Sequence, residues 1–133
     1  MSNKKDSISV ELNKAVQEAE NHNRWFSNSN ILNALSYWEN KLNKNVLDAW
    51  INRYNFVNQN SKVAIIMAGN FPMAGFHDLI SVIISGNNAI VKPSSDDKIL
   101  IEFFVSYLHK EFPETNKLVK IVVIIVVLLV LII

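Results

Sequence analysis

The stretch Val63-Ala64-Ile65-Ile66-Met67-Ala68-Gly69-Asn70-Phe71-Pro72 decides the fold class of this 133-residue chain. Its first five residues form a continuous apolar run, which is typical of a strand buried on both faces in a parallel sheet. Ala68-Gly69-Asn70 then predicts a turn, and Pro72 suits the first position of a helix. We predict that this helix ends at about Ser85, with Gly86 just after its C-terminal cap.

A second strand and a second helix follow the first pair. Ala89-Ile90-Val91-Lys92 is a short apolar strand, and Ser95 is a suitable cap for the helix after it. Because each connection is long enough to hold a helix, we expect parallel strands joined by right-handed crossovers. The sequence therefore predicts half of an open α/β sheet. Such sheets bind ligands beyond the carboxyl ends of their strands, here at Ala68-Gly69-Asn70 and Lys92-Pro93-Ser94.

Apolar residues recur at helical spacing along each predicted helix. Three helices are expected before the sheet, and Ser27 or Ser29 caps the second of them. Their predicted buried faces are Ile8, Leu12, Ala15, Val16 and Ala19; Ile31, Leu35, Trp38 and Leu42; and Val46, Leu47, Trp50, Ile51 and Tyr54. The two later helices are expected to bury Phe76, Leu79, Ile80 and Ile83, and then Ile99, Leu100, Phe103, Phe104, Tyr107 and Leu108. In the last helix, Asp96 and Asp97 in the first turn, with His109 and Lys110 in the last, would complement the helix dipole.

The chain divides into a helical segment over 1–58, an α/β unit over 59–117 and an apolar tail over 118–133. Every residue from Ile121 to Ile133 is Val, Ile or Leu. This run is shorter than the roughly 17–25 apolar residues of a spanning helix. Its first residues suit a third strand. For the rest, a membrane anchor and a shifted reading frame both stay open.

Composition excludes several kinds of function. The formal net charge is +1, which gives no electrostatic basis for binding nucleic acid. Cysteine is absent, so disulfides, thiolate metal sites and a cysteine nucleophile are excluded from these residues. His22 and His109 lack partners at metal-ligand spacing, and we expect no metal site. The polar start, Met1 to Asp6, is unlike a signal peptide, and we expect a cytoplasmic protein.

Two motifs resemble those of the aldehyde dehydrogenase superfamily. Asn70-Phe71-Pro72 after a buried strand resembles its Asn-Phe-Pro motif, and Gly86-Asn87 followed by Ala89–Ser94 resembles its second signature, a strand ending in Lys-Pro-Ser. Within the superfamily, the stretches 67–72 and 75–78 are most similar to the bioluminescence-type (Lux) acyl-CoA reductases, as are Trp25-Phe26 and the segment 50–54. The resemblance covers roughly residues 20–117.

The resemblance implies an NADPH-dependent fatty acyl-CoA reductase that converts an acyl-CoA or acyl thioester to an aldehyde. Asn70 matches the amide that stabilises the oxyanion, and Lys92 matches the lysine that reaches the adenosine ribose. Ala68, Gly69, Ser94 and Ser95 are implied to line the same nicotinamide cofactor site, so the unit over 59–117 would be part of a cofactor-binding domain. In the family, the catalytic cysteine lies downstream of this region. The chain is therefore expected to be an N-terminal fragment that is inactive alone.

Each assignment has a simpler alternative. Asn70 suits an ordinary turn, Lys92 a solvated strand end, and Ser94 and Ser95 suit helix caps. His77 and Asp78 are interpreted as a surface pair. A different class of function is a membrane-tethered or interaction protein with a degenerate α/β unit, and a third possibility is a non-functional truncated translation product. An exposed edge of a half sheet would also favour oligomers.

Overall fold

The computed structural model describes residues 2–57 and 60–123, with side chains from residue 8 onward. Within these ranges the chain is a mixed α/β protein with five α-helices, one 3-10 helix and three strands. The elements are α1 (Ser2–His22), α2 (Asn28–Lys41), α3 (Lys44–Ile51), β1 (Lys62–Ile66), α4 (Phe76–Ile84), β2 (Asn88–Lys92), α5 (Lys98–Glu111), η1 (Pro113–Lys117) and β3 (Val119–Ile121).

The three strands form one parallel sheet in the order β1-β2-β3, which confirms the predicted half of an open α/β sheet and is consistent with a truncated Rossmann-like fold. Lys62 pairs with Asn88 and Ile66 with Lys92, so β1 and β2 end level with each other. β3 pairs beside β2 from Val119 to Ile121. The expected third strand is therefore present, and residues 124–133 of the apolar run lie outside the described part of the chain.

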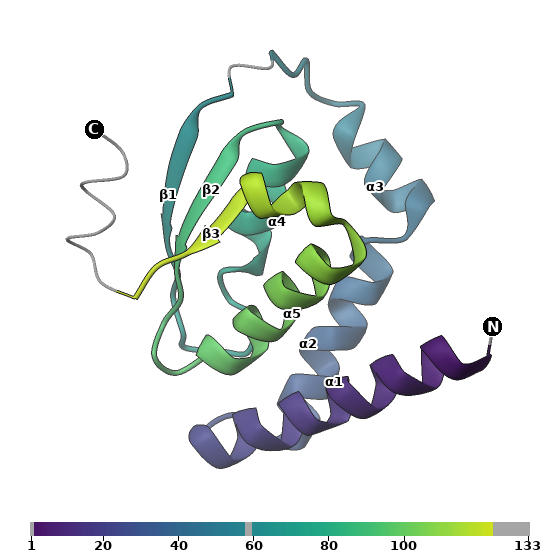
Figure 1. Cartoon of the computed structure of the whole chain (residues 1–133), viewed down its shortest axis with the longest axis vertical. Coiled ribbons are helices and arrows are strands. Elements are labelled where there is room, and N and C mark those ends of the chain that lie inside the picture. Colours follow the sequence, from purple (N-terminus) through teal and green to yellow (C-terminus); the bar gives the residue numbers. More distant parts are fainter. Residues whose placement is uncertain (1, 58–59, 124–133) are drawn as a thin grey trace.

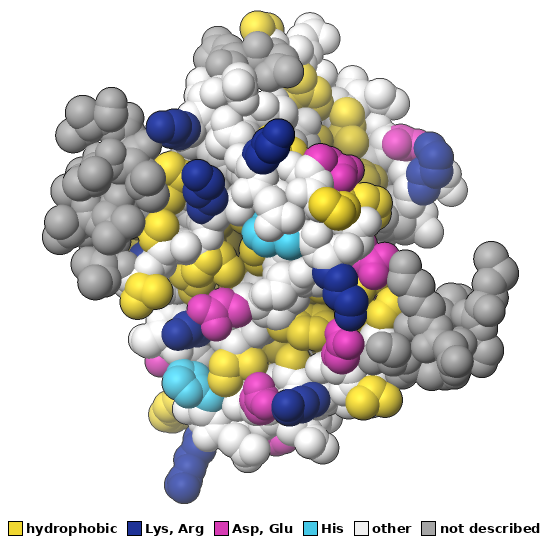
Figure 2. Space-filling view, viewed as in Figure 1, with side chains coloured by type: hydrophobic (Ala, Val, Ile, Leu, Met, Phe, Trp, Pro, Cys, Tyr) yellow, Lys and Arg dark blue, Asp and Glu magenta, His cyan; other side chains and the backbone are white. Residues whose placement is uncertain are grey.

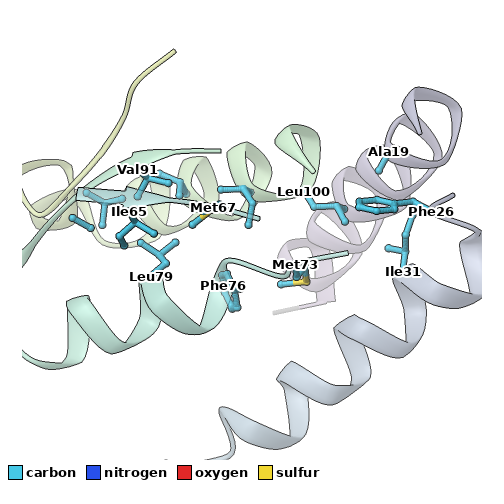
Figure 3. Packing of buried hydrophobic residues seen from close by; sticks show 14 of the residues in the cluster. Ala19, Phe26, Ile31, Ile65, Met67, Met73, Phe76, Leu79, Val91 and Leu100 are labelled. Carbon is cyan, nitrogen blue, oxygen red and sulfur yellow. The ribbon is translucent and has the colours of Figure 1, made fainter. Parts of the chain in front are cut away.

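One face of the sheet packs on α4 and α5, and α1 runs along the far side of α5 (Figure 1). Alternate strand residues point into this layer, and Figure 3 shows Ile65, Met67 and Val91 beside Leu79 of α4. The same cluster continues past Met73 to Phe26 and Ile31 near the start of α2 (Figure 3). A single core therefore joins the sheet to the N-terminal helices. Ala15, Val16 and Ala19 of α1 are buried as predicted.

The face of β1 that points away from the helices is open, although Ile90 on the same face of β2 is buried beside Val122, and this corrects one prediction. β1 was expected to be buried on both faces, but Ala64 is exposed and Ile66 is 62% exposed. The physical reason is that, in the described ranges, both crossover helices cover the same face, where Ile65 and Met67 point. An apolar run does not by itself distinguish one covered face from two.

Two helix starts differ from the predictions. α4 begins at Phe76 rather than at Pro72, because residues 70–75 form a separate turn before it. α5 begins at Lys98 with Asp97, not Ser95, as its N-cap residue, so Asp96 and Asp97 are not in its first turn. Its other end is as predicted, with His109 and Lys110 in the last turn. Gly86 also has the positive φ of 76° expected after the end of α4.

The helix faces are partly as predicted. Ser27 caps α2 by accepting a hydrogen bond from Asn30 N, and Ile31 is buried. In α3 the described residues include no buried side chain, and Val46 and Tyr54, expected to face inward, are 45% and 56% exposed. In α5 the fully buried positions are Leu100, Ile101 and Val105, so the helix is rotated from the predicted face. No described helix combines the length and apolarity needed to cross a membrane.

Candidate active site

The residues singled out from the sequence meet at the carboxyl edge of the sheet. Met67 N donates a hydrogen bond to Lys92 O at 3.0 Å, which extends the β1–β2 ladder by one residue beyond β1. The Ala68-Gly69-Asn70 turn and the Lys92-Pro93-Ser94 segment therefore leave the sheet side by side. This is the edge at which open parallel sheets bind their ligands. The structure brings the two sequence motifs together.

Gly69 is the point of closest approach between the two motifs. A Cβ atom built on Gly69 would lie 2.1 Å from the Ser94 Oγ atom and 2.5 Å from its Cβ atom. No side chain fits at that separation, so only glycine lets the two segments pack in this way. Ser94 Oγ in turn accepts a hydrogen bond from Asp96 N at 3.2 Å. Ser94 is thus a packing and turn residue as well as a neighbour of the candidate site.

The turn that carries Asn70 is held from both sides. Asn70 and Phe71 are exposed, whereas Met73 is 1% exposed and its side chain lies in the core cluster shown in Figure 3. Met73 has a φ of 61°, a left-handed conformation that costs an ordinary residue roughly 1–3 kcal/mol. Its N–H donates to the Asp97 Oδ2 atom at 2.6 Å. These two contacts of Met73 fix the backbone of the turn, and Asn70 lies exposed on that turn.

Asp97 is the most unusual charged group in the described chain. Its side chain is 2% exposed, and its Oδ1 atom has no hydrogen-bond partner among the described residues. Burial raises the pKa of the Asp97 carboxyl to about 7, while the backbone N–H groups of Met73 and Ala74 oppose that rise. Desolvation therefore outweighs hydrogen bonding at this site. The carboxyl group changes charge near neutral pH.

A large cavity opens next to Asn70, between the turn and α2. Its volume is about 720 Å³. Phe71, Pro72, Met73 and Ala74 form one wall, and aromatic side chains of the N-terminal helical region form the other, namely Trp25, Tyr37 and Trp38. Trp38 is fixed there by an edge-to-face contact with Phe76, with ring centroids 4.9 Å apart. The polar part of the lining consists of Asn30, Asn33, Asn70 and His77. A mostly apolar cavity with a few polar groups at its wall suits an apolar substrate with one polar, reacting end.

A smaller cavity, of about 230 Å³, lies on the Lys92 side of the same edge. Lys92, Pro93 and Ser95 line it together with Lys98, Glu102 and the segment Ile121–Val123. Lys98 and Glu102 form an ion pair at 3.6 Å, while Lys92 is half-buried. Two ammonium groups face one carboxylate, so the lining has a net positive charge that suits an anionic group.

The remaining candidates have more ordinary settings. Ser95 has an exposed side chain, and its backbone carbonyl accepts a hydrogen bond from His22 Nε2 at 2.7 Å, which ties the end of α1 to this loop. His77 and Asp78 are an exposed pair 3.6 Å apart, as the sequence indicated. Among the described residues, no three His, Asp or Glu side chains gather in a way that would hold a metal ion. On the face shown in Figure 2, basic and acidic side chains are interspersed among hydrophobic ones.

Two parts of the site were missed from the sequence. Asp97 was interpreted as a helix-dipole residue, but its carboxylate reaches Met73, 24 positions earlier. Trp38 was predicted to lie on a buried helix face, but it lines the cavity together with Trp25, which precedes α2 and is 87% exposed. Both depend on contacts between distant segments. The adjacent acidic pair after Lys-Pro-Ser-Ser was a visible feature, but its pattern fitted an ordinary helix start equally well.

Comparison with known proteins agrees with this arrangement. The family model for the LuxC acyl-CoA reductases matches residues 4–128, which includes both motifs and the helices that form the cavity wall. Searches of curated proteins and of solved structures return no match. A match over nearly the whole chain shows the family. The chain therefore belongs to the LuxC family of acyl-CoA reductases.

Proposed function

We propose that this region binds both the acyl thioester and NADPH in the reaction that reduces an acyl-CoA to an aldehyde. The observation that carries the proposal is the packing of Gly69 against Ser94, which places Asn70 and Lys92 at one edge of one sheet. Each of the two residues lines its own cavity. The geometry thus offers separate places for the two reactants on either side of the Asn70 turn.

Asn70 is the proposed oxyanion donor. Attack of a thiolate on a thioester carbonyl places negative charge on the oxygen, and a preorganised N–H donor stabilises that charge. The Asn70 amide makes no hydrogen bond within the described ranges, so it is available to a ligand. The 133 residues contain no cysteine, and the attacking thiolate would therefore have to come from outside them.

The cavity of about 720 Å³ is the proposed acyl site. Burial of a hydrocarbon chain against Trp25, Trp38 and Phe71 is favoured by roughly 0.8 kcal/mol for each methylene group. Asn70 lies at the wall of this cavity, so an acyl chain bound there would bring its carbonyl carbon close to the amide. This placement favours a long apolar acyl group over a short or charged one.

Lys92 and its neighbours are the proposed cofactor contacts. A cavity of about 230 Å³ is too small for a whole dinucleotide, so it fits only one part of NADPH, which we take to be the adenosine ribose with its 2′-phosphate. Lys92 and Lys98 offer positive charge there, while Glu102 opposes it in part. Ala68, Gly69, Ser94 and Ser95 supply the adjoining backbone. When bound, the nicotinamide would supply hydride to the acyl group.

Calorimetric titration of the chain with NADPH and with NADH tests this assignment. We expect tighter binding of NADPH, because a 2′-phosphate gains charge-assisted contacts. Lys92→Ala should weaken NADPH binding about tenfold or more, since such a contact is worth roughly 1.5–3 kcal/mol. Lys120→Ala is the matched control, because Lys120 is an exposed lysine that pairs with the middle of β2.

Two results would contradict the cofactor assignment. One is equal binding of NADH and NADPH, which would remove the argument from charge. The other is an equal loss of affinity in Lys92→Ala and Lys120→Ala, which would mean that only the overall charge matters. A Glu102→Gln variant adds an internal check, because removing the opposing carboxylate should strengthen NADPH binding and leave NADH binding nearly unchanged.

A further inference from the structure

We propose that Asp97 is a positioning residue, whose carboxylate fixes the turn carrying Asn70 to the loop that follows Lys92. The role of Asn70 is taken from the proposed function, but the placement of its turn by Asp97 rests on geometry alone. The contact joins residues 24 positions apart and runs between the two sequence motifs. It lies just behind the exposed edge where Asn70 and Lys92 emerge.

The Asp97 carboxylate does not cap α5, the helix that begins directly after it. Asp97 stands at the N-cap position of α5, where an aspartate commonly accepts a hydrogen bond from the first turn, yet it makes no such bond. Its Oδ2 atom instead accepts from Met73 N at 2.6 Å. Asp97 therefore makes its hydrogen bond to the Met73 turn instead of capping α5, and this position allows it to fix that turn.

The turn needs such a contact because its backbone is strained. Met73 adopts a φ of 61°, which a side chain with a Cβ atom tolerates poorly, and this conformation persists only where the surroundings impose it. The buried Met73 side chain fixes one side of the turn and Asp97 fixes the other. Asn70, three residues earlier, is then held in one place relative to Lys92.

The setting of Asp97 is costly for a residue with only a structural role. It is 2% exposed, and its Oδ1 atom has no partner in the described part of the chain. A buried carboxylate with a free oxygen destabilises a fold relative to a neutral side chain of similar shape. Thr115, the other buried polar side chain among the described residues, has its hydroxyl paired with Phe112 O at 2.7 Å.

The direct test is NMR spectroscopy of the full chain, with the side-chain amide of Asn70 as the reporter. Asp97→Ala should shift both Asn70 side-chain N–H signals and speed hydrogen exchange at Met73 N. Asp97→Asn keeps an acceptor oxygen and should restore both to near the wild-type values. Thr115→Ala is the matched control, because it removes a buried polar group whose hydrogen bond goes to Phe112 O and not to the Asn70 turn. The Asn70 signals should therefore stay at their wild-type positions in this variant. Affinity for dodecanoyl-CoA should fall about tenfold in Asp97→Ala only.

A pH titration keeps the test decisive if Asp97→Ala does not fold. In the wild-type chain, the Asn70 side-chain signals should move with the same midpoint as the Asp97 carboxyl carbon. His22→Gln and His77→Gln variants are compared as controls, because His22 contacts the loop after Lys92 and His77 lines the cavity beside the Asn70 turn. The Asn70 signals and the Asp97 carboxyl carbon should still share one midpoint in both histidine variants. In Asp97→Asn, the movement of the Asn70 signals with pH should disappear.

Two outcomes would overturn the proposal. In one, Asp97→Ala folds and leaves the Asn70 signals at their wild-type positions. In the other, Asp97 titrates while the Asn70 signals stay still. Neither readout needs an acyl ligand, so a wild-type chain that fails to bind dodecanoyl-CoA would count against the proposed function and not against this inference.

Discussion

At the scale of single residues, Gly69 decides whether the two motifs can meet. Its missing Cβ atom is what admits Ser94, whose Oγ atom lies 2.1 Å from the position that a Cβ would take. Relief of such a contact requires movement of the backbone, because Ser94 Cβ is itself only 2.5 Å away. The identity of this residue therefore controls the distance between the Asn70 turn and the segment that follows Lys92.

We predict that Gly69→Ala destabilises the chain by roughly 1–3 kcal/mol, as expected for overpacking in a closely packed region. Ser94→Gly in the same chain should recover part of the loss, because it removes both atoms that clash. Urea denaturation of the two single variants and the double variant measures this coupling. Strictly additive effects would show that Gly69 and Ser94 are not packed against each other.

Asp97 gives a second prediction at this scale, on the pH dependence of stability. Its pKa is about 7 in the folded chain and 3.8 for the free carboxyl. Between about pH 4 and pH 7, the folded chain therefore binds more protons at Asp97 than the unfolded chain does. Asp97 must then make the unfolding free energy fall as pH rises through that window, by at most about 4 kcal/mol, and the effect levels off above it.

The matching variant is Asp97→Asn, which cannot titrate. We predict that its melting temperature exceeds that of the wild-type chain by a margin that grows from pH 4 to pH 7 and is constant from pH 8 upward. Thermal scans at half-unit pH intervals measure this difference. A margin that shrinks as pH rises would mean that the folded state favours the charged carboxylate, contrary to the effect of burial.

At the scale of elements, local sequence patterns predicted the type and order of helices and strands better than they predicted the residues at which these elements begin. β1, α4, β2 and α5 occur in the predicted order, because a change from a continuous apolar run to helical spacing is a local signal. Pro72 and Ser95 were wrongly placed at helix starts. Each has the chemistry of a helix start, but long-range contacts of Met73 and Asp97 shape both loops.

The contrast between local sequence signals and long-range contacts also explains which parts of the candidate site could be predicted. Asn70 and Lys92 were placed correctly at one edge, since parallel strands with helical crossovers bring successive carboxyl ends together. The cavity beside Asn70 was not predicted, because the residues of its other wall, up to Trp38 of α2, lie more than thirty positions before Asn70 in the sequence. The burial of α3 was overestimated for a related reason, since helical spacing shows which residues share a face but not what covers it.

α2 provides a prediction at the element scale. Trp38 lines the cavity and packs edge-on against Phe76 of α4, so Trp38→Ala should lower the affinity for dodecanoyl-CoA by about tenfold or more. Leu32→Ala is the control on the same helix, because Leu32 is 50% exposed and does not line this cavity. Calorimetric titration compares them. Equal affinities in both variants would place the acyl chain elsewhere.

At the scale of the whole molecule, the chain combines the proposed binding elements with a complete lack of thiol groups. All 133 residues lack cysteine, so no acyl-enzyme thioester can form on them. We predict that the purified chain produces no aldehyde from dodecanoyl-CoA and NADPH above the protein-free background. Gas chromatography of the extracted aldehyde is the assay. Turnover that rises in proportion to chain concentration would contradict this prediction.

The division of the site between two ligands is the central claim, and residue-resolved NMR titration tests it most directly. NADPH should shift the backbone signals of Ala68, Gly69, Lys92, Ser94 and Ser95, whereas dodecanoyl-CoA should shift those of Phe71, Ala74, Tyr37 and the Asn70 side chain. The account predicts two adjoining sets of shifted residues that meet at the Asn70 turn. Shifts by both ligands in one common set, or shifts confined to the open face of the sheet, would contradict it.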